Sequence, residues 1–150
     1  KISWDNIVVM MQREVADRLN AEIGTKAYGV LTLTIQYYAQ AQLAIKVPAS
    51  AFNPSPNVDS AVVMLTPIVP ETVVDNPDKL FSVVKGSFAH RRKSLWNNML
   101  QMFGKQEDVK QRIQDALDSV NIASSIRAER LSLNQLTALY EALKLQGLIK

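Results

Sequence analysis

The segment Phe52-Asn53-Pro54-Ser55-Pro56-Asn57-Val58-Asp59-Ser60-Ala61-Val62-Val63 joins a proline-rich loop to an apolar strand candidate that continues to Leu65. Proline fixes its own φ and restricts the residue before it, so we expect Pro54 and Pro56 to hold the loop stiff and extended, presenting Phe52. A rigid ring of this kind is able to stack on a planar ligand, including a base swung out of its helix. The alternative is that Phe52 closes the end of a sheet, and composition alone favours this alternative.

Before and around this segment, the first half of the chain alternates between strand and helix patterns. Residues 7–11 form a short apolar run of the kind that is buried in a parallel sheet, and residues 13–20 carry apolar side chains at helical spacing. Residues 43–47 and 58–65 are further strand candidates. Residues 31–37 alternate with period two and, by pattern alone, predict another strand. The first half therefore predicts an α/β unit.

The second half has a helical pattern throughout. Residues 71–78 have the composition of a linker. Beyond it, apolar residues recur at helical spacing in four stretches, namely 80–88, 95–103, 109–120 and 133–143. Ser132 and Gln135 have the spacing of a capping box at the start of the last stretch. We therefore predict α/β plus all-α architecture, with one domain over residues 1–68 and a small helical domain over residues 69–150.

Composition excludes several classes of protein and site. A chain of 150 residues with 47% hydrophobic and 21% charged residues is typical of a globular domain rather than a disordered, collagen-like or membrane protein. There is no cysteine, and His90 is the only histidine. We therefore expect no disulfide, no metal site and no cysteine or Ser-His nucleophile. No export signal is evident, so we expect a cytoplasmic protein with no membrane partner.

The charged residues are distributed unevenly. Acidic and basic residues balance in residues 1–70, so the net charge of +3 lies in residues 71–150. Arg91, Arg92 and Lys93 form the densest basic cluster and predict a fan of cations at a helix end that straddles a phosphate backbone. The alternative, a solvated polar face on a helix, is equally compatible with the pattern.

Catalytic motifs are missing from the sequence. The five glycines are scattered and form no phosphate-binding loop, and no pair of acidic residues stands out as a general acid and base. We therefore predict no catalytic and no cofactor-binding residue within this chain.

Four groups of residues, taken together, resemble the ribosomal RNA adenine dimethyltransferase family. Residues 52–60 match F-x-P-x-P-x-V-x-S. Residues 12–19 read Q-R-E-V-A-x-R-L and are followed by G-x-K-x-Y-G-x-L at 24–31. Residues 88–97 read F-x-x-R-R-K-S-L-x-N, and residues 127–132 read R-A-E-x-L-S. Their order across nearly the whole chain resembles the small-subunit type more than the related erythromycin-resistance methyltransferases.

The resemblance implies a Rossmann-like methyltransferase domain that uses S-adenosylmethionine, followed by a helical RNA-binding domain, acting on two adjacent adenines of small-subunit ribosomal RNA. By resemblance, this chain holds the last strands of the first domain, and the donor site lies before Lys1, so the fragment alone is expected to be inactive. Phe52 is then the aromatic against the target base, supported by Pro54 and Pro56, and residues 91–93 contact ribosomal RNA. The resemblance also replaces the strand predicted from period two with a helix over residues 28–38.

Two other functions remain open from the residues alone. In the first, the chain is a non-catalytic RNA-binding or ribosome-assembly module that docks through its basic cluster. In the second, it is a protein-binding helical domain with an incidental basic patch.

Overall fold

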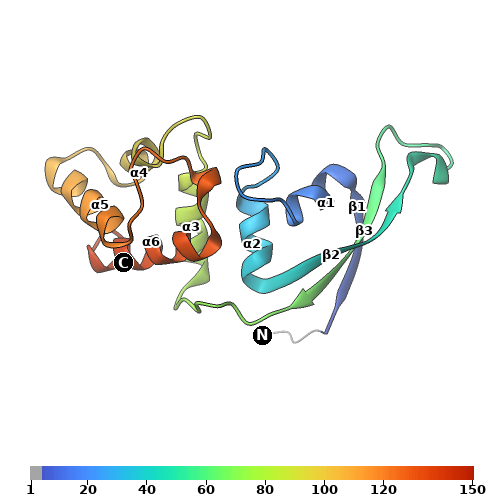
Figure 1. The fold of residues 1–150 in the computed structure, drawn as a ribbon, viewed down its shortest axis with the longest axis horizontal. Coiled ribbons are helices and arrows are strands. Elements are labelled where there is room, and N and C mark those ends of the chain that lie inside the picture. Colours follow the sequence, from blue (N-terminus) through green and yellow to red (C-terminus); the bar gives the residue numbers. More distant parts are fainter. Residues whose placement is uncertain (1–4) are drawn as a thin grey trace. The chain divides into compact units, whose positions relative to one another are not determined.

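The computed structural model describes residues 5–150, and the chain divides into two units, Lys1–Pro70 and Glu71–Lys150 (Figure 1). Trp4, which its residue type suggests as a core or core-edge aromatic, lies outside the described residues. Within residues 5–150, no helix is long and apolar enough to cross a lipid bilayer.

The first unit is a three-stranded sheet with two helices (Figure 1). Its elements in chain order are β1 (Ile7–Gln12), α1 (Arg13–Leu19), α2 (Val30–Tyr38), β2 (Ala39–Val47), the short 3-10 helix η1 (Ala49–Ala51) and β3 (Ser60–Pro67). The strand order is β1-β3-β2, so the last strand in sequence lies in the middle. The proline-rich loop is therefore the connection between an edge strand and the central strand.

The expectation of a buried parallel strand at residues 7–11 is wrong in pairing and in burial. β1 pairs with β3 in the antiparallel direction, with Val9 opposite Val63, and the side chain of Val8 is 64% exposed. An apolar run predicts a strand but does not specify the direction of its neighbour. Val8 and Met10 are exposed because they lie on the face of the sheet opposite to the core that Met11 packs against.

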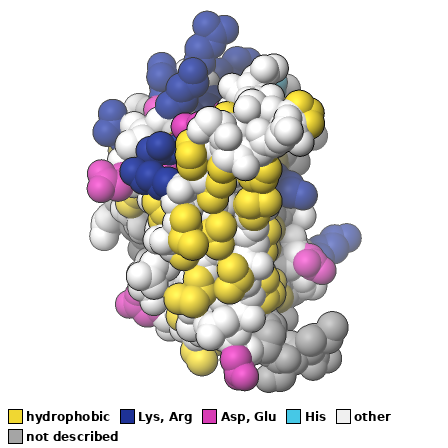
Figure 2. Space-filling view, turned by 90° about the vertical axis from the view of Figure 1, so that its right-hand side faces the viewer, with side chains coloured by type: hydrophobic (Ala, Val, Ile, Leu, Met, Phe, Trp, Pro, Cys, Tyr) yellow, Lys and Arg dark blue, Asp and Glu magenta, His cyan; other side chains and the backbone are white. Residues whose placement is uncertain are grey.

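The two faces of the sheet differ in their cover. The inner face packs against α1 and α2, and its core consists of Ala16, Leu19, Ala41, Ala61 and Val63, with Met11, Ile35 and Leu65 packed against them. The outer face is also apolar: Val8 is paired with Met64, Met10 is paired with Val62, and Ile45 is 58% exposed. Figure 2 shows hydrophobic side chains gathered on one face of the molecule. Within the described residues of this unit, α1 and α2 both pack on the inner face of the sheet.

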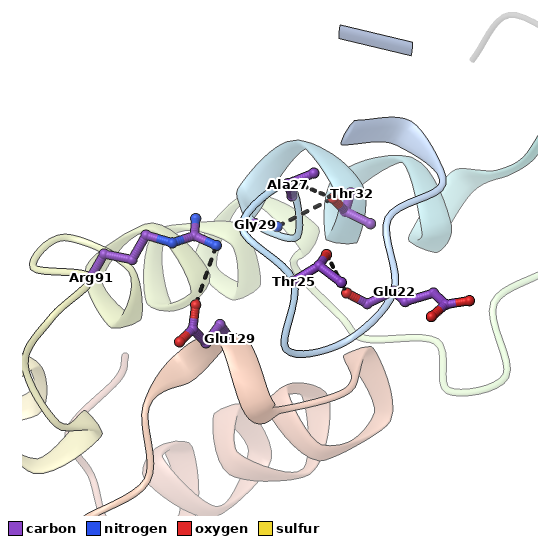
Figure 3. Close-up of polar contacts among 7 residues, drawn as sticks. All are labelled: Glu22, Thr25, Ala27, Gly29, Thr32, Arg91 and Glu129. Atoms are coloured by element: carbon purple, nitrogen blue, oxygen red, sulfur yellow. Dashed lines mark hydrogen bonds and ion pairs between the residues drawn. The ribbon is translucent and has the colours of Figure 1, made fainter. Parts of the chain in front are cut away.

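α2 is a helix, as the family resemblance implies, although its alternating sequence by itself predicts a strand. Leu33 and Tyr37 lie four residues apart and are both buried, which is the helical spacing of a core-facing stripe. The hydroxyl of Thr34 donates to the carbonyl of Val30 within the helix at 2.7 Å. At the helix start, the backbone N–H of Gly29 donates to Thr32 Oγ1 at 3.2 Å (Figure 3). Threonine therefore fits this helix because its hydroxyls find backbone partners.

The aromatic pair that ends α2 differs in exposure. Tyr37 is 3% exposed and belongs to the core, whereas Tyr38 is 47% exposed. Their rings are 5.0 Å apart in an edge-to-face arrangement. Tyr38 therefore covers Tyr37 from outside rather than sharing its burial.

The second unit contains four α-helices, which confirms the four predicted helical stretches. They are α3 (Pro77–Ser87), α4 (Leu95–Phe103), α5 (Glu107–Ser119) and α6 (Leu133–Leu145), with the short 3-10 helix η2 (Ala128–Arg130) before α6. The predicted capping box is present: Gln135 N–H donates to Ser132 Oγ at 3.1 Å, and Ser132 N–H donates to Gln135 Oε1 at 2.9 Å. α3 begins at Pro77, inside the stretch that was predicted to be a linker, because Asn76 caps it.

α6 provides the centre of the second core. Its buried side chains pack with those of α3 and α5. The largest fully buried side chains of these three helices are Leu80, Ile113, Leu117, Leu136, Leu139, Tyr140 and Leu143. α3 and α4 approach closely at Gly86, where a Cβ would lie 1.9 Å from Met102 Sδ. The absence of a side chain at Gly86 thus allows α4 to pack tightly against α3, and this contact fixes the two helices that flank the basic cluster.

Candidate nucleic-acid interface

Arg91, Arg92 and Lys93 lie in the turn between α3 and α4, not on a helix end as the sequence predicts. α3 ends at Ser87, and the backbone N–H of Lys93 donates to the carbonyl of His90 at 2.9 Å. This bond closes a β-turn with Arg91 and Arg92 at its two central positions. All three cationic residues are exposed. The helical fan is therefore replaced by a tight turn that presents the cations outward. We call residues 90–94 the basic turn.

The three cations of the basic turn have different surroundings. Arg91 Nη2 lies 3.5 Å from Glu129 Oε2 (Figure 3), and its guanidinium carbon lies 5.7 Å from the centre of the Phe88 ring. Within residues 5–150, the structure records no ion pair for Arg92 or Lys93. Arg91 is thus held against the surface and partly neutralised, whereas Arg92 and Lys93 offer uncompensated positive charge.

The start of α4 lies beside the basic turn, but its backbone donors are already engaged. The N–H of Leu95 donates to the Ile126 carbonyl at 2.6 Å, and the N–H of Trp96 donates to the Ser124 carbonyl at 3.1 Å. The next N–H, from Asn97, donates to the Ser94 hydroxyl at 3.3 Å. These three N–H groups are therefore not free to bind an anion, which leaves the cationic side chains of the basic turn as its candidate partners.

The same bonds bring a second segment to the basic turn. Because Ser124 and Ile126 accept from α4, the loop that leads to η2 runs along the start of this helix. Glu129 of η2 then reaches Arg91. The sequence contains Glu129 within the R-A-E-x-L-S motif, but no pattern shows that it pairs with a cation 38 residues earlier.

Phe52 lies in the loop between β2 and β3 of the first unit and is half-buried. The backbone of Phe52 is extended, with φ −107° and ψ 151°, as expected, but bends at residues 52–54 and 57–58 mean that the loop as a whole is not extended. The Asp59 carboxylate accepts from the Ala49 N–H at 2.9 Å, and the Ser55 hydroxyl donates to the Phe52 carbonyl at 3.1 Å. These two bonds bend the loop back on itself.

The prolines of this loop, Pro54 and Pro56, are both exposed, and the Asn53–Pro54 peptide bond is cis. They flank Ser55, whose hydroxyl makes the bond described above. Phe52 is neither sealed in the core nor free of contacts. Stacking of a base on Phe52 and loop support by the prolines stay predictions.

The sites predicted from the sequence thus fall on two loops. The three cations share the basic turn of the second unit, and Phe52, Pro54 and Pro56 share the β2–β3 loop of the first. Among residues 5–150, no cluster of three or more His, Cys, Asp or Glu side chains has the arrangement of a metal site. No pattern in the sequence singles out Asn98, whose side chain contacts the basic turn.

A three-stranded antiparallel sheet with two helices, followed by a helical unit that carries an exposed basic turn, is the arrangement that the family resemblance implies for this chain. The chain belongs to the ribosomal RNA adenine dimethylase family, whose model matches residues 1–144. This match confirms the resemblance carried by the four sequence motifs.

Curated relatives agree with this family. The chain is 71% identical over 147 residues to ribosomal RNA small subunit methyltransferase A of Leuconostoc mesenteroides, covering 98% of this chain and 50% of the relative. It is 54% identical over 143 residues to the protein of the same name from Lactiplantibacillus plantarum, covering 95% of this chain and 48% of the relative. The chain spans about half the length of these relatives.

Solved structures show the same fold. A dimethyladenosine transferase from Plasmodium falciparum superposes with a TM-score of 0.82 at 24% identity, covering 96% of this chain and 58% of that one. The 23S rRNA methyltransferase ErmE superposes with a TM-score of 0.58 at 22% identity, covering 93% of this chain and 55% of that one. The chain therefore has the fold of the C-terminal portion of these methyltransferases.

Proposed function

We propose that this chain is the RNA-holding, C-terminal portion of an enzyme that methylates the exocyclic amines of two adjacent adenines in small-subunit ribosomal RNA. The observation that carries the proposal is the basic turn, which presents Arg92 and Lys93 with no ion-pair partner among residues 5–150, on a chain of the adenine dimethylase family. Phosphate contacts of this kind position an RNA but do not read its sequence. The partner is the immature small ribosomal subunit, and the site of action is the cytoplasm.

The methyl donor, S-adenosylmethionine, supplies an activated methyl group on a sulfonium when bound. Within the described residues, the hollow of the first unit does not fit a site for it. The hollow beside α2 in the first unit is lined by Leu19, Asn20, Ile35, Gln36, Ala39, Gln40, Ala41 and Ile68. This lining has neither a glycine-rich loop nor an acidic side chain for ribose hydroxyls. We therefore place donor binding outside this chain and assign its residues to holding and orienting the RNA.

The proposal that this chain holds the RNA and that the donor binds outside it is tested by a methyl-transfer assay on immature small subunits with radiolabelled S-adenosylmethionine. This chain alone is expected to transfer no methyl groups, whereas a full-length protein that contains it transfers them to the two adenines. The reason is that the chain offers contacts to the RNA but no donor site. Methyl transfer by the isolated chain would contradict the proposal.

The alternative function is a non-catalytic module that docks on ribosomal RNA during assembly. It is favoured by the location of Arg92 and Lys93 in the helical unit, where the carboxylate at the basic turn, Glu129, is already paired with Arg91. The same assay separates the two functions, because a full-length protein that binds the subunit without methylating it would be a module of this kind.

A further inference from the structure

We propose that Asn98 is a positioning residue that holds the basic turn in the shape that binds RNA phosphates. Asn98 lies on α4 and is 1% exposed, although asparagine is usually a surface residue. Its burial is not explained by the helix itself, since the side chain reaches out of α4 to the turn before it. The inference rests on the proposed function, in which the basic turn contacts ribosomal RNA.

The amide of Asn98 binds both backbone groups of His90. Its Oδ1 accepts from the His90 N–H at 3.1 Å, and its Nδ2 donates to the His90 carbonyl at 3.2 Å. The same Nδ2 also donates to the Ser94 carbonyl at 3.3 Å. One buried side chain thus fastens the residue before the three cations and the residue after them.

Fastening both ends restricts the residues between them. The turn bond from Lys93 N–H to the His90 carbonyl ends on the same oxygen that Asn98 engages. Loss of the amide leaves the His90 N–H without its partner and removes one of the donors on that carbonyl. The cations would then sample many arrangements, and RNA binding would have to order them at the cost of affinity.

Asparagine suits this position because it has one acceptor and two donor hydrogens on a short stem. Aspartate has the same size and keeps an acceptor for the His90 N–H. It lacks both donor hydrogens, however, and sets a negative charge against the carbonyls of His90 and Ser94. The contacts therefore predict that Asn98→Ala and Asn98→Asp both release the turn.

The test is a double-mutant cycle in the full-length protein, with the Kd for immature small subunits as readout. Asn98→Ala is expected to raise Kd about fivefold in the wild-type background and less than twofold in an Arg92→Ala/Lys93→Ala background, because Asn98 acts through these cations. Ile113→Val, which trims the core on α5, is the control for general destabilisation and is expected to leave Kd unchanged.

A second variant covers the outcome in which Asn98→Ala does not fold. Asn98→Asp is compared with Asn97→Asp, which adds the same charge on the exposed neighbouring position of α4. The inference predicts a larger loss of affinity for Asn98→Asp, together with faster hydrogen exchange at the Lys93 amide. Equal losses for the two aspartate variants would overturn it.

The remaining outcomes separate this inference from the proposed function. If Arg92→Ala/Lys93→Ala weakens binding but Asn98→Ala does not, the positioning role is wrong and the RNA contact stands. If Asn98→Ala weakens binding equally in both backgrounds, its effect does not pass through the cations, and the inference is also wrong. If Arg92→Ala/Lys93→Ala leaves Kd unchanged, the assignment of the basic turn to RNA fails, and the inference fails with it.

Discussion

At the scale of single residues, the cations of the basic turn are not equivalent. Arg91 is paired with Glu129 and lies over Phe88, whereas Arg92 and Lys93 have no recorded partner within residues 5–150. The sequence located the cluster, because charge density is visible in composition. It did not reveal the pairing of Arg91, which depends on a contact between segments far apart in the chain.

The prediction for catalysis at this scale concerns Phe52. In the full-length protein, Phe52→Ala is expected to lower the rate of methyl transfer to immature small subunits about tenfold, because stacking of a base on an aromatic ring contributes about 1–3 kcal/mol. Kd for the subunit should stay within a factor of about two, since the phosphate contacts are proposed for the basic turn and not for Phe52. Single-turnover methylation and a binding titration measure the two quantities.

The control for this prediction is Val58→Ala, which changes an apolar side chain of the same loop that is 48% exposed. It should leave both the rate and Kd unchanged. A Phe52→Ala enzyme with the wild-type rate would show that the ring closes the end of the sheet and does not contact the base.

At the scale of helices and strands, the four helices of the second unit were predictable from the sequence, whereas the conformation of α2 and the pairing direction of β1 were not predictable from pattern alone. The four helices of the second unit follow from apolar spacing, and the capping box at Ser132 marks the start of the last one. α2 was predicted only from the family resemblance, because its alternating threonines have the pattern of a strand. The contacts of their hydroxyls with backbone groups, which fit them to a helix, are not visible in the sequence. The direction of β1 depends on its neighbour, which local pattern does not encode.

The segment before α3 is tied to α6 by a carboxylate, and this contact predicts a pH effect. Asp75 Oδ2 lies 2.6 Å from Lys144 Nζ, and the Tyr140 hydroxyl donates to Asp75 Oδ1 at 3.1 Å. The hydrogen bond from Lys144 holds the pKa of Asp75 below its usual value. A carboxyl with a lowered pKa stabilises the fold above its unfolded pKa of about 3.9, and this contribution is lost as pH falls through the folded value.

The expected result is that Asp75→Asn lowers the melting temperature at pH 7 and that this difference shrinks below about pH 4. Thermal unfolding followed by circular dichroism between pH 7 and pH 3 measures it. Asp17→Asn is the matched control, because Asp17 is exposed on α1 and has no recorded partner among the described residues. A difference that stays constant down to pH 3 would argue against the ion pair.

At the scale of the whole molecule, the two units contribute different things. The first offers a sheet whose outer face is apolar and exposed at Val8, Met10 and Ile45, which agrees with the proposal that it is one part of a larger methyltransferase domain. The second carries the net positive charge and the basic turn. The sequence predicted this difference in charge and pattern. The assignment of catalysis to one domain and RNA binding to the other stays a prediction.

The central claim, that the basic turn binds the phosphate backbone of ribosomal RNA, is tested most directly by the salt dependence of binding. Kd for immature small subunits is measured as a function of salt concentration for the full-length protein and for its Arg92→Ala/Lys93→Ala variant. Each lost phosphate contact reduces the slope of log K against log salt by roughly 0.7–0.9, so the account predicts a slope that is shallower by about 1.4–1.8 in the variant. Identical slopes for the two proteins would contradict it.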